Sequence, residues 1–157
     1  VNSDLLLNID FAPTLLDLAG IDVPDEMQGT SFKPLLESNK KVMTRDAVYY
    51  HYYEFPKWHK VQPHYGVRTS RYKLIHFYYS MDNWELYDLE NDPNEMNNIY
   101  SEASKGLIDS LKLRLSDLKK EYKDDFTVQE MKVMTDTVIR RVYNEPNKLK
   151  TKLLFKC

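Results

Sequence analysis

The first part of the chain places short apolar runs between polar breaks. An apolar run at Leu5–Ile9 is typical of a buried strand. Asp10 is a preferred N-cap residue, and Pro13 suits the first turn of a helix because its missing N–H would have no partner there. Gly20 predicts the end of that helix. The polar stretch 37–44 is predicted to be a linker.

Between Arg45 and Leu89 the apolar positions recur every second residue. Four segments rich in Val, Tyr and other strand-forming residues are predicted as strands: 46–54, 64–69, 72–79 and 84–89. Short turns separate the later segments, and such turns join neighbouring antiparallel strands. The pattern therefore predicts a small four-stranded antiparallel sheet.

An amphipathic helix is predicted after the sheet. Apolar residues recur at steps of three and four between Leu107 and Tyr122, and Ser101 or Ser104 can cap this helix. Neither the helix nor the sheet can bury its apolar side alone, so we expect the helix to lie on one face of the sheet. Thr127-x-x-Glu130 has the spacing of a capping box and predicts a second helix. The predicted fold class is α+β.

Composition narrows the possible functions. The chain has 157 residues, with 22 Lys and Arg against 24 Asp and Glu, so its net charge of −2 gives no support for a nucleic-acid partner. No apolar run approaches the roughly 20 residues of a membrane-spanning helix. The single cysteine is the last residue, so no disulfide can form within the chain.

Motifs that would mark a self-sufficient catalytic site are absent. The sequence contains no G-x-S-x-G, no glycine-rich phosphate loop and no H-E-x-x-H. Asp124 and Asp125 form an acidic pair, but the pair falls in a polar helix connection and is interpreted as a solvated loop rather than a metal site. We therefore predict no catalytic residue and no metal ligand in this chain.

The segment from Tyr49 to His76 holds all four histidines, several cations and many aromatic residues. Aromatic faces together with cationic donors suit a sugar that carries an anionic group. Strands rich in Tyr and His also pack simply as cross-strand pairs, so a structural role stays open for each histidine. His59 and His64 favour the binding interpretation because they flank a loop bounded by prolines.

Three sequence motifs carry a family resemblance. They are DFAPT at 10–14, MQG at 27–29 and ELYDL at 85–89, the last followed by Asp92-Pro93. The stretch NIDFAPTLLDLAGIDVPDEMQGTSFKPLL resembles the end of the catalytic domain of type I, formylglycine-dependent sulfatases. HYGVRTSRYKLIHFY and WELYDLENDPNEMNNIY resemble the C-terminal subdomain of the same family. The resemblance covers about residues 3 to 122.

The resemblance implies a division of the chain. Residues 1–44 would close an alkaline phosphatase-like α/β catalytic domain, as a strand and helix left from that domain. Residues 45–122 would form the antiparallel sheet and helix of the C-terminal subdomain. Residues 123–157, which resemble no known pattern, would be a basic helical extension.

The resemblance also implies a function for the parent protein, namely hydrolysis of sulfate esters on carbohydrates, with similarity to bacterial N-acetylglucosamine-6-sulfatases. Such enzymes use a formylglycine, made within C/S-x-P-x-R, and a calcium ion. This sequence has no C/S-x-P-x-R, so both groups are expected upstream of the chain and neither is held by its residues. The implied partners are the upstream catalytic domain and a sulfated sugar, and the chain alone is expected to be inactive.

Carried over to this sequence, the resemblance implies substrate contacts from Glu54, His59 and His64. Arg68 would orient His64 or reach the substrate itself. Export to the periplasm is implied by the bacterial family members alone, since no signal peptide is visible in the sequence.

Two alternatives remain open. Thirteen Lys and Arg follow Ser101, so the chain could be a structural or oligomerisation module that contacts no substrate. It could equally be the corresponding part of a phosphoesterase of the alkaline phosphatase superfamily. The sequence upstream of Val1 would separate the phosphoesterase from the sulfatase.

Overall fold

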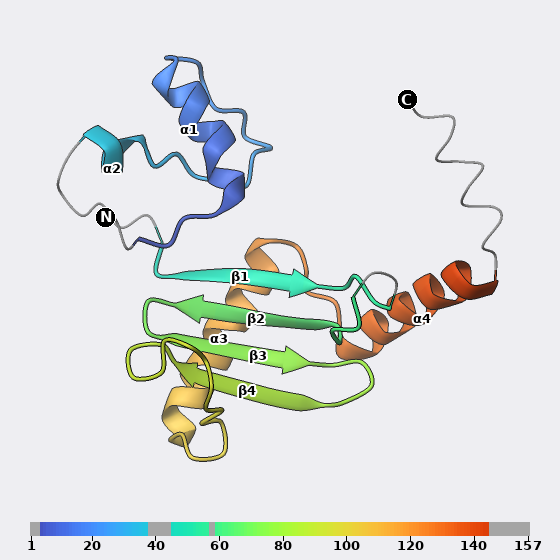
Figure 1. Ribbon diagram of the computed structural model, residues 1–157. Helices are drawn as coiled ribbons and strands as arrows, with labels where there is room; N and C mark the ends of the chain where they lie inside the picture. The colour runs from blue at the N-terminus through green and yellow to red at the C-terminus, as the bar shows by residue number, and fades with distance from the viewer. Residues whose placement is uncertain (1–3, 38–44, 57–58, 145–157) are drawn as a thin grey trace.

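The fold consists of a helical N-terminal segment, a four-stranded sheet and two longer helices (Figure 1). A computed structural model describes residues 4–37, 45–56 and 59–144, so most of the predicted linker and the chain beyond 144 lie outside the described residues. In chain order the elements are η1 (Asn8–Asp10), α1 (Phe11–Leu18), α2 (Lys33–Glu37), β1 (Ala47–Tyr52), β2 (His64–Thr69), β3 (Tyr72–Phe77), β4 (Asn83–Asp88), α3 (Lys105–Glu121) and α4 (Val128–Asn144).

The four strands form one antiparallel sheet in the order β1-β2-β3-β4. The turn between β2 and β3 is tight because the Thr69 hydroxyl accepts the Tyr72 N–H at 2.8 Å. This confirms the sheet that the alternation of apolar residues predicts. The connection between β1 and β2, residues 53–63, is much longer.

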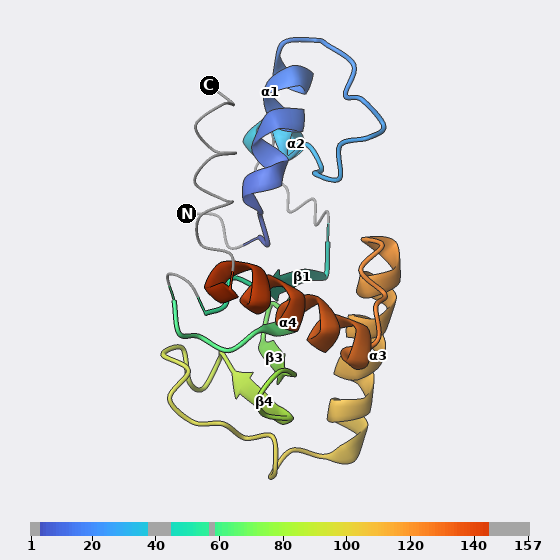
Figure 2. The ribbon, with the colours of Figure 1, turned by 90° about the vertical axis from the view of Figure 1, so that its right-hand side faces the viewer.

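Helix α3 covers one face of the sheet, here called the α3 face (Figure 2). The residues of the buried core come from all four strands, the β3–β4 connection and both long helices, and are Ala47, Tyr65, Val67, Leu74, Tyr78, Leu86, Leu111, Leu115, Leu118 and Met131. Each large apolar side chain contributes about 1.5–3 kcal/mol by leaving water. Ser104 is the N-cap of α3 and accepts the Leu107 N–H, as one of the two predicted caps. The helix on one sheet face is therefore confirmed.

The predicted capping box begins α4. The Glu130 N–H donates to the Thr127 hydroxyl at 3.3 Å, and the Glu130 carboxylate accepts the Thr127 N–H at 2.8 Å. Met131 is 2% exposed and joins the core beneath α3. Later in the helix, Met134 and Val138 are exposed. The first turns of α4 are therefore the part that packs on the sheet.

Asp124 lies between α3 and α4 and is tied to the sheet. Its carboxylate accepts the Tyr49 hydroxyl at 2.5 Å and the His51 Nδ1–H at 2.7 Å. The other ring nitrogen of His51 accepts the Tyr78 hydroxyl at 2.9 Å. The prediction of a solvated loop is therefore wrong for Asp124, because its two donors come from β1, more than 70 residues earlier in the chain.

His76 is also part of the α3 face. Its ring stacks on Trp84 with 4.0 Å between centroids, its Nδ1 accepts the Tyr65 hydroxyl, and its Nε2 donates to Asp82, both at 2.7 Å. For His51 and His76 alike, burial lowers the pKa by more than the neighbouring carboxylate raises it. Burial therefore favours the neutral ring for both histidines, and each ring is held by hydrogen bonds to the sheet and its connections.

The N-terminal segment departs from the sequence prediction. Leu5–Ile9 forms no strand, because residues 5–7 lack a paired neighbour and Asn8–Asp10 turns as a 3₁₀ helix. A strand needs a partner for its backbone groups, and here the Leu7 N–H is satisfied by the Asp10 carboxylate at 2.7 Å. Large apolar side chains of this segment are exposed, namely Leu6, Ile9, Phe11, Leu15, Leu18 and Ile21.

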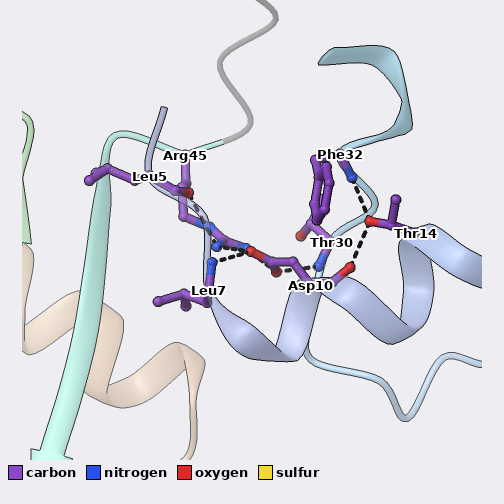
Figure 3. Close-up of polar contacts among 7 residues, drawn as sticks. All are labelled: Leu5, Leu7, Asp10, Thr14, Thr30, Phe32 and Arg45. Carbon is purple, nitrogen blue, oxygen red and sulfur yellow. Dashed lines mark hydrogen bonds and ion pairs between the residues drawn. The ribbon is translucent and has the colours of Figure 1, made fainter. Parts of the chain in front are cut away.

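The Asp10 carboxylate does not cap its own helix but joins distant segments (Figure 3). It accepts hydrogen bonds from both terminal nitrogens of Arg45, at 2.5 and 2.8 Å, and from the Thr30 N–H at 2.9 Å. Burial alone would raise the pKa of Asp10, but these hydrogen bonds outweigh burial and lower it. The Asp10–Arg45 pair fixes where the N-terminal segment meets the start of β1.

Thr14 completes this junction. Its hydroxyl donates to the Asp10 carbonyl at 2.6 Å and accepts the Phe32 N–H at 3.0 Å, as Figure 3 shows. Gly29 passes so close to the Ile9 carbonyl that a Cβ would collide with it. DFAPT and MQG therefore hold the 21–32 loop against α1, and Gly20, at a φ of 71°, ends that helix as predicted.

The two parts of the chain should differ in hydrogen exchange. We expect amides of α1 to exchange faster than those of β2 and β3, because α1 exposes much of its apolar surface whereas the central strands are covered by α3. Mass spectrometry of exchanged peptides measures this ranking. Slower exchange in α1 would contradict the expectation that the N-terminal segment depends on neighbours outside this chain.

Stability should depend on pH through the two buried histidines. Their folded pKa values lie below the unfolded value of about 6.5, so the unfolded chain binds more protons and the free energy of unfolding falls as the pH drops through about 6.5. Urea denaturation between pH 7.5 and 5.5 measures this slope. His51→Gln and His76→Gln should flatten it, because each removes one of the groups whose pKa folding lowers. A wild-type free energy of unfolding that stays constant or rises on acidification would contradict lowered pKa values for His51 and His76.

Candidate functional site

The predicted site residues lie along one strand and its neighbouring loop. His64 begins β2, and Arg68 lies four residues further along the same strand. Side chains alternate along a strand, so both lie on the face opposite α3, here called the helix-free face because no helix of the described residues covers it. Glu54 and His59 are exposed in the connection that follows β1. Tyr52 pairs with His64, so Glu54 leaves the sheet at the His64 end.

His64 is held by aromatic rings and one carbonyl. The imidazole stacks on Tyr52 with 5.3 Å between centroids and contacts Phe77 at 4.9 Å and the edge of Tyr50 at 6.0 Å. Its Nδ1 lies 2.8 Å from the Gln62 carbonyl oxygen, which can only accept, so Nδ1 carries the hydrogen. In the neutral ring Nε2 is then an acceptor, and no residue in the described part of the chain bonds to it.

Arg68 lies too far along the strand to orient His64. Four residues of a strand span about 13 Å, and the Gln62 carbonyl and the aromatic rings already fix the imidazole. Within the described ranges the Arg68 guanidinium has no hydrogen bond or ion pair, whereas the nearby Lys73 is paired with Glu95 at 2.5 Å. Of the two predicted roles for Arg68, reaching a ligand is therefore the one that the geometry allows.

Tyr50 was missed by the sequence prediction. Its hydroxyl is buried on the helix-free face, without a hydrogen-bond partner among the described residues, and burial raises its pKa. The hydroxyl lies over Gly66, where a Cβ would be only 2.5 Å from it. A buried hydroxyl without a partner costs about 1–3 kcal/mol, so it favours a partner from outside this chain. The detectable signal was Gly66, since a glycine inside a strand marks a close approach.

The helix-free face presents several polar groups that have no partner among the described residues. Across residues 4–37, 45–56 and 59–144, no three His, Cys, Asp or Glu side chains converge to hold a metal ion. No helix in these ranges is long and apolar enough to cross a membrane. The face offers an oriented imidazole, an unpaired guanidinium and a buried hydroxyl, which suit a polar, anionic ligand.

Comparison with known proteins places the chain beside carbohydrate sulfatases. It is 49% identical over 128 residues to an N-acetylglucosamine-6-O-sulfatase of Bacteroides thetaiotaomicron, covering 79% of this chain and 23% of the relative. It is 36% identical over 135 residues to a Δ4,5-hexuronate-2-O-sulfatase of the same organism, covering 82% of this chain and 26% of the relative. The chain thus spans about a quarter of the length of these relatives.

A solved structure shares the fold. It matches with a TM-score of 0.69 and 48% identity, covers 76% of this chain and 25% of that protein, and contains D-glucosamine-2-N,6-O-disulfate as that protein's substrate. The family model for the C-terminal region of N-sulphoglucosamine sulphohydrolase matches residues 1–121. The chain therefore belongs to this family and corresponds to the C-terminal part of a sulfatase.

Proposed function

We propose that the parent protein hydrolyses sulfate esters on carbohydrates and that this chain contributes substrate-binding residues to it. The observation that carries the proposal is the His64 imidazole, held with Nε2 available on a helix-free face. The adjacent Tyr50 hydroxyl, buried without a partner among the described residues, supports it. Relatives at 49% and 36% identity that act on sulfated sugars support the substrate class.

Each proposed contact has a distinct chemical role. His64 Nε2 accepts a sugar hydroxyl when the ring is neutral and donates to an anionic oxygen when it is protonated. Arg68 offers a planar fork of donors that matches the oxygens of a sulfate or carboxylate. Glu54 and His59 are exposed at the His64 end of the sheet, where they would contact the rim of the sugar. None of these residues attacks the ester.

The reactive groups of the parent are assigned to its upstream part. A formylglycine would supply the nucleophile and a calcium ion would polarise the sulfate oxygens when bound. The described residues of this chain do not fit a metal site, so their task is to bind and orient the sugar. Export of the parent, as implied by its bacterial relatives, belongs to the same proposal.

The division at 1–44, 45–122 and 123–157 is also part of the proposal. Helix α1 lies beyond the β1 edge of the sheet (Figure 1). Phe11, Leu15 and Ile21, in and just after this helix, have exposed apolar side chains that the upstream domain would cover. Patches of this kind on a soluble surface mark interfaces. The Asp10–Arg45 pair would then transmit the position of that domain to the sheet.

The chain alone should release no sulfate from glucosamine-6-sulfate, whereas the parent that includes the upstream region should do so. Sulfate release followed by ion chromatography measures both. Turnover by the isolated chain would contradict the assignment of the reactive groups. A parent that cleaves a phosphate ester and no sulfate ester would instead support the phosphoesterase alternative.

His64→Ala in the parent should lower kcat/KM by one to two orders of magnitude, about 1.4–2.7 kcal/mol, because an oriented hydrogen bond to the sugar is lost. His64→Gln should recover part of the loss, since an amide can still bond. Lys105→Ala, at the exposed start of α3, is the matched control and should stay within twofold.

Steady-state kinetics at matched thermal stability measures these values. If neither His64→Ala nor Arg68→Ala changes kcat/KM, the substrate-binding assignment fails, and the structural-module alternative gains support. Membership of the sulfatase family would stand in either case.

A further inference from the structure

A hollow lies on the α3 face, on the opposite side of the sheet from His64. It has a volume of about 370 Å³, and its principal lining residues are Tyr65, Trp84, Lys112, Lys119, Lys120 and Asp125. Tyr65 and Trp84 form the sheet side, and the lysines come from α3. None of these residues belongs to the substrate-binding set proposed above.

Lys112 is held over an aromatic ring by two interactions. Its Nζ lies 4.2 Å from the centroid of Trp84 and donates to the Tyr100 hydroxyl at 2.7 Å. Trp84 is in turn stacked on His76, which is buried. The ammonium has three donors, so two remain beyond the bond to Tyr100. Lys112 is thus fixed in place without its donors being used up.

Lys119 repeats this arrangement seven residues later on the same side of α3. Its Nζ lies 4.4 Å from the centroid of Tyr65 and donates to the Phe126 carbonyl at 3.1 Å. Burial lowers the pKa of Lys119 even though Asp124 and Asp125 raise it. The charge is therefore only partly compensated, and an anion entering the hollow would stabilise it.

These two lysines differ from three other half-buried cations of the fold. Arg45, Lys73 and Arg114 each pair with a carboxylate. Over the described ranges, Lys112 and Lys119 have no carboxylate within 4 Å. Asp125 lines the same hollow but forms no ion pair with either lysine. Two cations that are positioned by rings and have no carboxylate at ion-pair distance indicate a site for an anionic ligand.

The strands beneath the two lysines indicate what kind of anion fits. Tyr65 pairs with His76, and His76 pairs with Trp84, so the strands that carry Tyr65 and Trp84 are two strand spacings apart, about 9.6 Å. Two ammonium groups held over rings of these strands favour a ligand with separate anionic groups over one small anion. A ligand with two anionic groups on a longer polar frame can reach both lysines, and the volume of the hollow admits part of such a frame.

We propose that this hollow is a second binding site, which takes a saccharide carrying two or more sulfate groups. The proposal rests on the proposed function for the choice of sulfated sugars among anions, whereas the anion site itself rests on Lys112 and Lys119. Such a site holds part of a sulfated chain away from the helix-free face. It increases affinity for a long substrate without contacting the reacting ester.

Isothermal titration calorimetry of this chain with a fully sulfated heparin tetrasaccharide tests the site. Lys112→Gln and Lys119→Gln should each weaken binding about tenfold, the loss of one charge-assisted hydrogen bond. Lys120→Gln, at an exposed position of the same hollow, should weaken it severalfold and removes no packed group. Lys105→Gln makes the same charge change on α3 outside the hollow and should stay within twofold.

Three results would overturn the proposal. The first is an equal loss for Lys105→Gln, which would indicate diffuse attraction along α3. The second is equal binding of the desulfated tetrasaccharide or of inorganic sulfate, which would exclude a sulfated saccharide as the specific ligand. The third is loss of binding in His64→Ala but not in the lysine variants, which would place the ligand on the helix-free face. Failure of sulfatase turnover in the parent changes none of these outcomes.

Discussion

The buried carboxylate of Asp10 is the interaction on which the arrangement of the chain depends. It is 1% exposed, yet it carries a charge that two backbone N–H groups and two hydrogen bonds from the Arg45 guanidinium compensate. Removing either member of such a pair leaves the other buried without compensation, at a cost of about 3–5 kcal/mol. The pair joins α1, the 21–32 loop and the start of β1, so the sheet and the N-terminal segment meet in one geometry.

The motifs that identify the family are structural rather than chemical. Asp10, Thr14 and Gly29 hold the junction, and their contacts are to backbone groups and to Arg45. The proposed substrate contacts, such as His64, instead occupy positions on a sheet face whose pattern is that of any half-buried strand. Membership of the family therefore fixes the fold of the junction, whereas the ligand depends on the side chains of the helix-free face.

The sheet and the long helices could be predicted because their signals are local. Alternation placed β2 at its observed bounds, and the spacing of serine and threonine caps placed the starts of α3 and α4. The expected strand at Leu5–Ile9 failed because strand formation depends on a neighbour. The prediction of a solvated Asp124 failed because the donors that bond it lie on β1, which is distant in sequence. The unpartnered hydroxyl of Tyr50 follows only from three-dimensional packing.

The two connections of β2 differ in length, and they differ in how much sequence change the sheet tolerates in each. The turn to β3 is closed by Thr69 and fixes the register. A one-residue shift of that register would turn His64 toward the α3 face and Tyr65 away from it. The connection of residues 53–63 enters β2 from the other side, and lengthening such a loop adds little entropic cost. For the proposed sugar site, new specificities could therefore arise by replacing this connection, while the imidazole and the core beneath it keep their places.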